Sequence, residues 1–222
     1  MEIMTHRAER SSREANVRRS GRAGERVVIS WNLLHTGGAR VEQVCQLIAQ
    51  QRPDLVLLQE ATAQMDALPD QIGGHYARMA LPGRHHGLAT WSEAPLQRPI
   101  ESLRLQRGLI VERTCQILQI GDVSFANVHL SHGQVLNRRQ LRRIAGALPD
   151  VAAILGDCNM VGAPLLPGFR DVGPREATHW PARVIPLRLD RCFVRGLTCT
   201  HSQVLARGAS DHWPIMVVLQ PI

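Results

Sequence analysis

An acid and an imidazole lie side by side near the end of the chain, directly before an apolar run. The tripeptide Ser210-Asp211-His212 precedes the hydrophobic residues 213–219. A carboxylate next to a histidine can bind a cation, hold a water molecule or move a proton near neutral pH. The tripeptide therefore predicts half of a catalytic site, placed at the start of a strand.

Five more apolar runs end in polar side chains that could supply the other half. The runs 27–30, 55–58, 125–128, 151–155 and 187–189 lead to Asn32, Glu60, His129, the pair Asp157 and Asn159, and Asp190, respectively. Polar residues at the ends of β-rich apolar runs are poorly suited to a core but well placed for a site at a sheet edge. One such acid would mean little, whereas six such ends together predict a common site.

The strand-like runs alternate with helical patterns at the start of the chain. A strand at 27–32 is followed by a helix whose apolar residues Val41, Val44, Cys45 and Ile48 share one face, and Pro53 ends that helix before a strand at 55–60. This opening unit is predicted to be β-α-β. Closely spaced runs between residues 75 and 130 predict antiparallel strands, at 75–80, 87–92, 101–105, 109–120 and 123–130. A helix is predicted at 137–148, and strands at 151–155, 187–195, 198–205 and 214–219 close the domain.

Composition favours a globular protein with anionic partners. The 222 residues suit one domain, which we place at 27–222, after an Arg-rich tail at 1–26 that we expect to be disordered. No apolar stretch approaches the roughly 20 residues that cross a bilayer. Five cysteines without a CxxC motif predict neither disulfides nor structural zinc, so we expect a reducing cytoplasm. The net charge of +7 favours phosphate-bearing ligands, although surface solubility explains it equally well.

The ordered set of motifs resembles the endonuclease/exonuclease/phosphatase superfamily. The set comprises Trp31-Asn32, Gln59-Glu60, the segment 127–130, Gly156-Asp157-Cys158-Asn159, Leu189-Asp190-Arg191 and Ser210-Asp211-His212. The resemblance covers residues 27–220 and implies an α/β fold, a four-layer αββα sandwich of two mixed β-sheets flanked by helices. It also implies a metal-dependent phosphoesterase.

The resemblance implies that Glu60 is the principal ligand of Mg²⁺ or Mn²⁺. An acid that ends so apolar a run is also costly to desolvate unless a cation or hydrogen-bond donors lie nearby. Asn32 is expected to help position Glu60, the metal or the phosphate, and Asp211 is assigned to the metal or to a bound water. Leu34 stands where the family often has a second polar residue, which puts a second metal role there in doubt.

Four further residues are expected to act on the phosphate and the attacking water. Asp157 would orient or deprotonate that water, while Asn159, two residues on along an extended segment, would donate to a phosphoryl oxygen. His212 would contact the phosphate, with Asp190 fixing its tautomer and raising its pKa. His129 would face them from the other sheet and either stabilise negative charge or protonate the leaving group.

Three functions are compatible with this set of residues. The first is a divalent-metal-dependent phosphodiesterase that acts on DNA or RNA, favoured by the arginine excess. The second is a phosphatase or phosphodiesterase for a small molecule, an inositol phosphate or a lipid headgroup. The third, a catalytically silent binding module, has no need for the full set. The remaining histidines show no HExxH spacing, which disfavours a zinc hydrolase, while Thr178-His179-Trp180 is expected near the pocket.

Overall fold

The computed structural model describes residues 24–108, 112–180 and 185–222. The predicted tail at 1–26 lies outside the described residues except for its last three, of which Arg26 already begins the first strand. The segment 109–111, predicted as strand, lies outside them as well. Within the described part of the chain, no helix combines the length and the apolarity needed to span a membrane.

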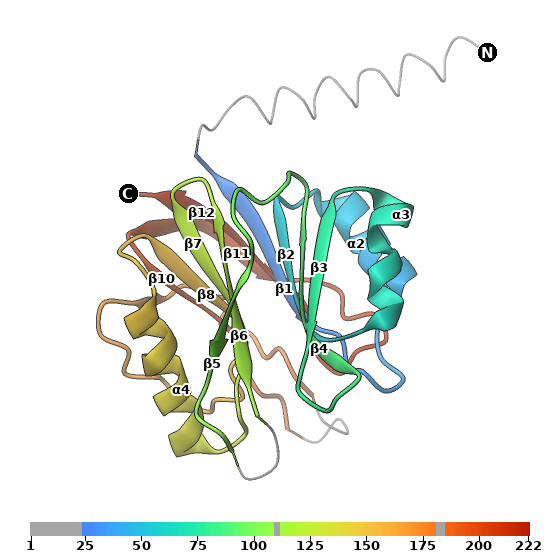
Figure 1. The fold of residues 1–222 in the computed structure, drawn as a ribbon. Coiled ribbons are helices and arrows are strands. Elements are labelled where there is room, and N and C mark those ends of the chain that lie inside the picture. Colours follow the sequence, from blue (N-terminus) through green and yellow to red (C-terminus); the bar gives the residue numbers. More distant parts are fainter. Residues whose placement is uncertain (1–23, 109–111, 181–184) are drawn as a thin grey trace, which may run out of the picture.

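Twelve described strands form two mixed six-stranded sheets (Figure 1). In spatial order, the first sheet consists of β11 (Leu197–Val204), β12 (Ile215–Pro221), β1 (Arg26–Asn32), β2 (Leu55–Thr62), β4 (His86–Ser92) and β3 (His75–Ala80). The second consists of β5 (Glu101–Arg104), β6 (Thr114–Ile120), β7 (Val123–His129), β8 (Ala152–Asp157), β10 (Asp190–Arg195) and β9 (Arg170–Asp171).

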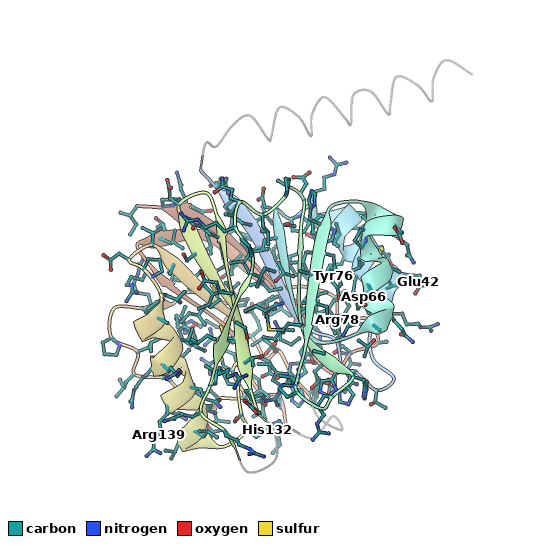
Figure 2. All side chains as sticks on the ribbon, viewed as in Figure 1. Glu42, Asp66, Tyr76, Arg78, His132 and Arg139 are labelled. Carbon is teal, nitrogen blue, oxygen red and sulfur yellow. The ribbon has the colours of Figure 1, made fainter. Side chains whose placement is uncertain are left out.

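Helices cover the outer face of each sheet. On the first sheet lie α2 (Val41–Gln51), the short 3₁₀ helix η1 (Ala63–Ala67) and α3 (Leu68–Ile72), and on the second lies α4 (Gln134–Ala147) (Figure 1). Helix α2 buries Val44, Leu47 and Ile48, which recur with helical spacing, and it ends where Arg52 adopts a left-handed conformation before Pro53. Figure 2 shows Arg139 pointing outward from α4, whose solvent face is basic.

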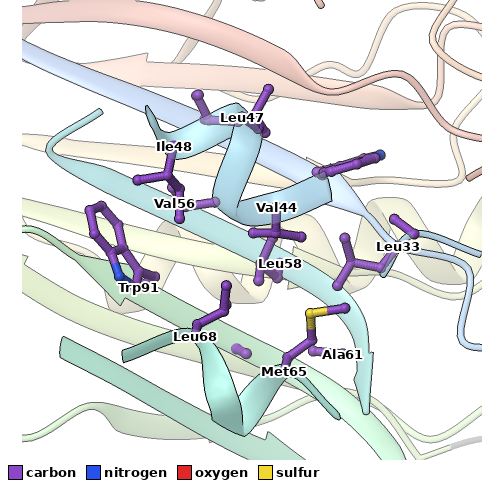
Figure 3. Close-up of a cluster of buried hydrophobic side chains, with 14 of the residues drawn as sticks. Leu33, Val44, Leu47, Ile48, Val56, Leu58, Ala61, Met65, Leu68 and Trp91 are labelled. Atoms are coloured by element: carbon purple, nitrogen blue, oxygen red, sulfur yellow. The ribbon is translucent and has the colours of Figure 1, made fainter. Parts of the chain in front are cut away.

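Three apolar clusters fill the spaces between the layers. The cluster between α2, α3 and the first sheet includes Trp91 and Leu58 and is drawn in Figure 3. A second cluster lies between the two sheets around Phe125, and a third lies between α4 and the second sheet around Phe193. Helix, sheet, sheet and helix therefore stack in four layers, and the predicted αββα sandwich is confirmed.

Two parallel strand pairs bring the predicted site residues to one end of the sandwich. Helix α2 connects β1 to β2, and their parallel register sets Asn32 opposite Gln59. Helix α4 connects β7 to β8, and that register sets His129 opposite Asp157. The carboxyl ends of all four strands lie at the lower end of the molecule in Figure 1, where Figure 2 labels His132 just after β7.

Several predicted strands and helices differ from the structure in their bounds or in their pairing. Antiparallel pairing holds within β3–β4 and within β5–β6–β7, but the chain changes sheet between them, over residues 93–100, where Pro95 and Pro99 interrupt regular pairing. Helix α4 begins at Gln134 rather than Asn137. The side chain of Asn137 is buried and donates to the carbonyl of Asn159, so a polar residue inside the helix serves the loop beside it.

Candidate active site

Seven of the eight predicted site residues line one pocket at this end of the sandwich. The pocket measures about 320 Å³, and its walls include Asn32, Glu60, His129, Asp157, Asn159, Asp211 and His212. Asp190, the eighth, is fully buried behind His212. The first sheet and the loop before β12 supply Asn32, Glu60, Asp211 and His212, and the second sheet and the loop after β8 supply the others. The pocket is therefore divided between two sheets.

Asp157 lies at the junction between the two halves. Its Oδ2 accepts a hydrogen bond from Asn32 Nδ2 at 3.0 Å and lies 3.4 Å from His129 Nε2 and 3.8 Å from His212 Nε2. Only 1% of the residue is exposed. Burial raises the pKa of the Asp157 carboxyl, and the positive charge of His212 only partly offsets this. A carboxylate with a raised pKa is a better proton acceptor than a solvated one.

His212 is held as a cation by buried carboxylates. Its Nδ1 donates to Asp190 Oδ2 at 2.8 Å, while its backbone is fixed by Ser210 and by the indole N–H of Trp31, which donates to the His212 carbonyl. Burial alone lowers the pKa of His212, but Asp190 and then Asp157 outweigh it and raise that pKa to about 10. The predicted partnership of Asp190 and His212 is present in the structure.

His129 has the opposite protonation state. Burial lowers its pKa well below the usual value, and the positive charges of Arg113 and His212 lower it further. At neutral pH His212 is therefore an imidazolium, whereas His129 is a neutral imidazole. Two groups of the same type are driven to different protonation states by their surroundings, as is common where acid and base functions are divided.

Glu60 reaches the pocket through an irregularity in β2. The register between β2 and β4 shifts between Leu58 and Ala61, and Glu60 has a φ of 56°, in the left-handed region. A bulge of this kind redirects a side chain, and non-glycine residues in this region are strained and cluster at functional sites. The sequence suggested a plain extended strand here.

The Glu60 carboxylate is shared between a loop and the pocket. Its Oε2 accepts the backbone N–H of His35 at 3.0 Å and also contacts His35 Nδ1, while Oε1 lies 4.0 Å from His129 Nε2. Burial raises the Glu60 pKa, but the two bonds from His35 outweigh it, so the net shift is downward. His35 was not among the predicted site residues, because it lies three positions beyond β1 with no motif around it.

Asn159 reaches the pocket from a left-handed turn after β8 and not from an extended segment. The expectation of an extended segment from Asp157 to Asn159 is wrong, since β8 ends at Asp157 and Asn159 has a left-handed φ of 47°. Its Nδ2 donates to Leu130 O at 3.0 Å and to Asp157 Oδ2 at 3.2 Å. In this conformation Asn159 fixes the carboxylate of Asp157, and its amide hydrogens are engaged within the protein.

The segment 178–180 contributes a histidine to the same pocket, as expected. His179 Nε2 lies 3.3 Å from Asp211 Oδ2, and its ring is centred 4.3 Å from that of His212. The hydrogen bond from His179 lowers the pKa of Asp211, which outweighs the effect of burial. Thr178 is buried, and its hydroxyl accepts the backbone N–H groups of Leu189 and Asp190, which fixes the start of β10.

The model of the endonuclease/exonuclease/phosphatase family matches residues 29–212, which include every one of these side chains. The chain belongs to this family. Family members are generally phosphoester hydrolases that depend on divalent metal ions. A search of curated proteins finds no match.

Solved structures of family members share the sandwich. An endonuclease/exonuclease/phosphatase protein from Bacteroides vulgatus superposes with a TM-score of 0.75 at 16% identity, covering 90% of this chain and 100% of that one. Truncated Caenorhabditis elegans TDP2 gives 0.70 at 20% identity, covering 88% and 98%. D. rerio TDP2, solved with a single-strand DNA product, gives 0.70 at 17% identity, covering 89% and 100%. At these identities the likeness establishes the fold.

The pocket of this family member suits a hard divalent cation. Glu60, Asp157 and Asp211 provide carboxylate oxygens, the ligand type that Mg²⁺ and Mn²⁺ prefer. Glu60 Oε1 is turned toward the pocket at a distance from His129 that is too long for a hydrogen bond, so it remains able to bind a cation. Leu34 lines the same pocket, and its side chain offers no ligand atom.

Proposed function

We propose that this protein hydrolyses phosphodiester bonds in nucleic acid, with a divalent cation bound at Glu60. The observation that carries the proposal is the placement of Asp157 Oδ2 between the two imidazoles, 3.4 Å from His129 Nε2 and 3.8 Å from His212 Nε2. Attack by water on a phosphoester requires a base next to an electrophilic group. Residues 27–222 would form the catalytic domain.

The electrophile in this proposal is His212. Its ring carries a positive charge at neutral pH because Asp190 binds Nδ1, so Nε2–H is the group free to donate to a phosphoryl oxygen. Developing negative charge on that oxygen strengthens the interaction during attack. Asp190 does not touch the phosphate and acts as a positioning residue.

The base in this proposal is Asp157. Its Oδ1 accepts the backbone N–H of Asn159 at 2.9 Å, and its Oδ2 is aimed by Asn32 toward the imidazoles. Its raised pKa favours acceptance of a proton from the attacking water. His129, neutral and only 5% exposed, is better suited to stabilising charge on the phosphate or on the leaving oxygen than to supplying an extra proton. A cation bound at Glu60 would supply further charge neutralisation on the phosphate.

Charge favours a nucleic acid as the substrate. The chain has a net charge of +7. The structural neighbour from D. rerio was solved with a single-strand DNA product, which supports the same class of ligand. A small phosphoester is a second candidate, because a pocket of about 320 Å³ is within the range that binds small molecules. A silent binding module is disfavoured, since binding alone does not require an oriented base and a charged imidazole.

The proposal is tested with a substrate panel. Supercoiled plasmid, single-stranded RNA and a small phosphodiester are each incubated with Mg²⁺, with Mn²⁺ and with chelator. We expect metal-dependent cleavage of a nucleic acid that weakens steeply as salt rises, because contacts to several phosphates release counterions. Cleavage of the small ester alone, with little salt dependence, would favour the second candidate. Cleavage of none of the three would contradict phosphodiester hydrolysis.

Two matched aspartate variants separate the site from a contaminating nuclease. Asp157→Asn removes the proposed base, while Asp122→Asn alters an exposed turn between β6 and β7. The first should lower kcat by about 10²-fold or more, and the second should leave it unchanged. Equal turnover in the two preparations would contradict the role proposed for Asp157.

A further inference from the structure

Three histidines meet beside Glu60, and none of them lines the pocket formed by His129, Asp157 and His212. His35 lies in the loop after β1, His85 lies in the turn before β4, and His86 is the first residue of β4. The ring centroids are 3.9 Å apart for His35 and His86, 5.4 Å for His35 and His85, and 5.2 Å for His85 and His86. One nitrogen from each ring lies within 4.8 Å of the other two.

These spacings are close to what one metal ion requires. With metal–nitrogen bonds of about 2.0–2.1 Å and tetrahedral angles, ligand nitrogens lie about 3.4 Å apart. Modest ring rotations would close the remaining gap. His85 is exposed, and therefore has room to turn toward the other two.

The buried member of the cluster offers an unused nitrogen. Nδ1 of His86 is inaccessible to solvent and makes no hydrogen bond within the described residues. A buried nitrogen without a partner is costly, and a metal ion is one group that would satisfy it.

His35 is oriented in the way that metal-binding histidines usually are. Such residues generally direct one ring nitrogen at a carboxylate, which fixes the ring and leaves the other nitrogen for the metal. Here Nδ1 of His35 contacts Glu60 Oε2, and Nε2 is left. Glu60 also supplies a negative charge next to His35, which favours a cation there.

We infer that His35, His85 and His86 form a binding site for a transition-metal ion of the zinc class, distinct from the carboxylate-lined hydrolytic pocket. Imidazole is a preferred ligand for Zn²⁺ and related ions, whereas Mg²⁺ prefers oxygen. The two sites therefore select different ions, although both adjoin Glu60. The inference concerns binding and does not depend on the proposed hydrolysis.

Zinc binding to the intact protein tests the inference. Equilibrium dialysis against Zn²⁺ is performed with Mg²⁺ in large excess, so that oxygen-rich sites are already occupied. The variant His85→Ala removes an exposed ligand outside the hydrolytic pocket. The control His75→Ala removes an exposed histidine from the opposite end of the same β3–β4 hairpin, where His75 pairs with Ser92.

We expect His85→Ala to bind one zinc equivalent fewer than the wild type, or to bind it more than about 10-fold more weakly, with His75→Ala unchanged. X-ray absorption of the bound zinc should show three imidazoles in the wild type. Circular dichroism checks that both variants are folded. The inference is overturned if His85→Ala binds zinc as the wild type does, or if zinc is lost only in His179→Ala, which would assign it to the cluster of His179, Asp211 and His212.

Discussion

The buried pair of Asp190 and His212 yields a quantitative prediction about stability. The pKa of His212 is about 10 in the folded protein, against an ordinary value of 6.5. At about 1.36 kcal/mol per pKa unit, this net shift corresponds to about 4 kcal/mol of stability at pH 7, after the cost of burying the ring. Asp190 is the largest favourable contributor, so we expect Asp190→Asn to cost about 2–3 kcal/mol at that pH.

The sign of the effect fixes its pH dependence. The pKa of His212 is raised on folding, so its contribution is fully present below pH 6.5, where the ring is charged in both states. It falls as pH rises toward 10, where the folded protein also loses the proton. The stability gap between wild type and Asp190→Asn should therefore be widest near pH 6 and close toward pH 10.

Urea unfolding monitored by tryptophan fluorescence, in chelator and at several pH values from 6 to 10, measures this gap. Asp66→Asn is the matched control, because Asp66 forms an exposed ion pair with Arg78 and should change stability by less than about 1 kcal/mol. A gap for Asp190→Asn that stays constant with pH, or that widens toward pH 10, would refute the assignment of His212 as a buried imidazolium.

Four further substitutions are predicted from the structure. Gly156→Ala should destabilise the protein strongly, because the added Cβ would lie 2.0 Å from the carbonyl oxygen of Val128. Gly146→Ala in α4 should instead stabilise the protein by about 0.5–1 kcal/mol. The melting temperatures of the two variants distinguish these effects. Glu60→Gln should weaken Mg²⁺ binding, measured by calorimetry, without lowering the melting temperature. An unchanged Mg²⁺ affinity would contradict the assignment of Glu60 as a metal ligand. Asn127→Leu should lower the free energy of unfolding, measured with urea, by about 2–4 kcal/mol. The reason is that the hydrogen bonds of the buried Asn127 side chain to Leu58, Ala89 and two glutamines would be lost. A decrease of less than about 1 kcal/mol would contradict this.

Much of the fold follows from patterns in the chain. Apolar runs that are buried on both faces identify the central strands, and helical spacing identifies α2, because both patterns are local. The strand ends then identify the site residues, since parallel strands joined by helices share one edge. The pocket accordingly contains Glu60, His129 and Asp157 together.

Other features depend on contacts that no local pattern records. The bulge that aims Glu60 and the left-handed turn at Asn159 are set by pairing with distant strands and loops. His35 and His86 are separated by many residues and meet only because β2 pairs with both β1 and β4. The raised pKa of His212 was predicted from its partner Asp190, but the lowered pKa of His129 was not, because it arises from burial and from charges nearby in space.

The amide network between the sheets has a consequence for folding. Gln59, on the first sheet, donates to Asn127, on the second, at 2.8 Å, and Asn127 donates back to Leu58 and Ala89 of the first sheet. Either sheet alone carries only some of the reactive groups. During refolding, we therefore expect catalytic activity to appear in a single late step, when these hydrogen bonds between the two sheets form. Activity should not rise gradually as individual strands form. The rate at which turnover recovers would then measure the rate of this last step.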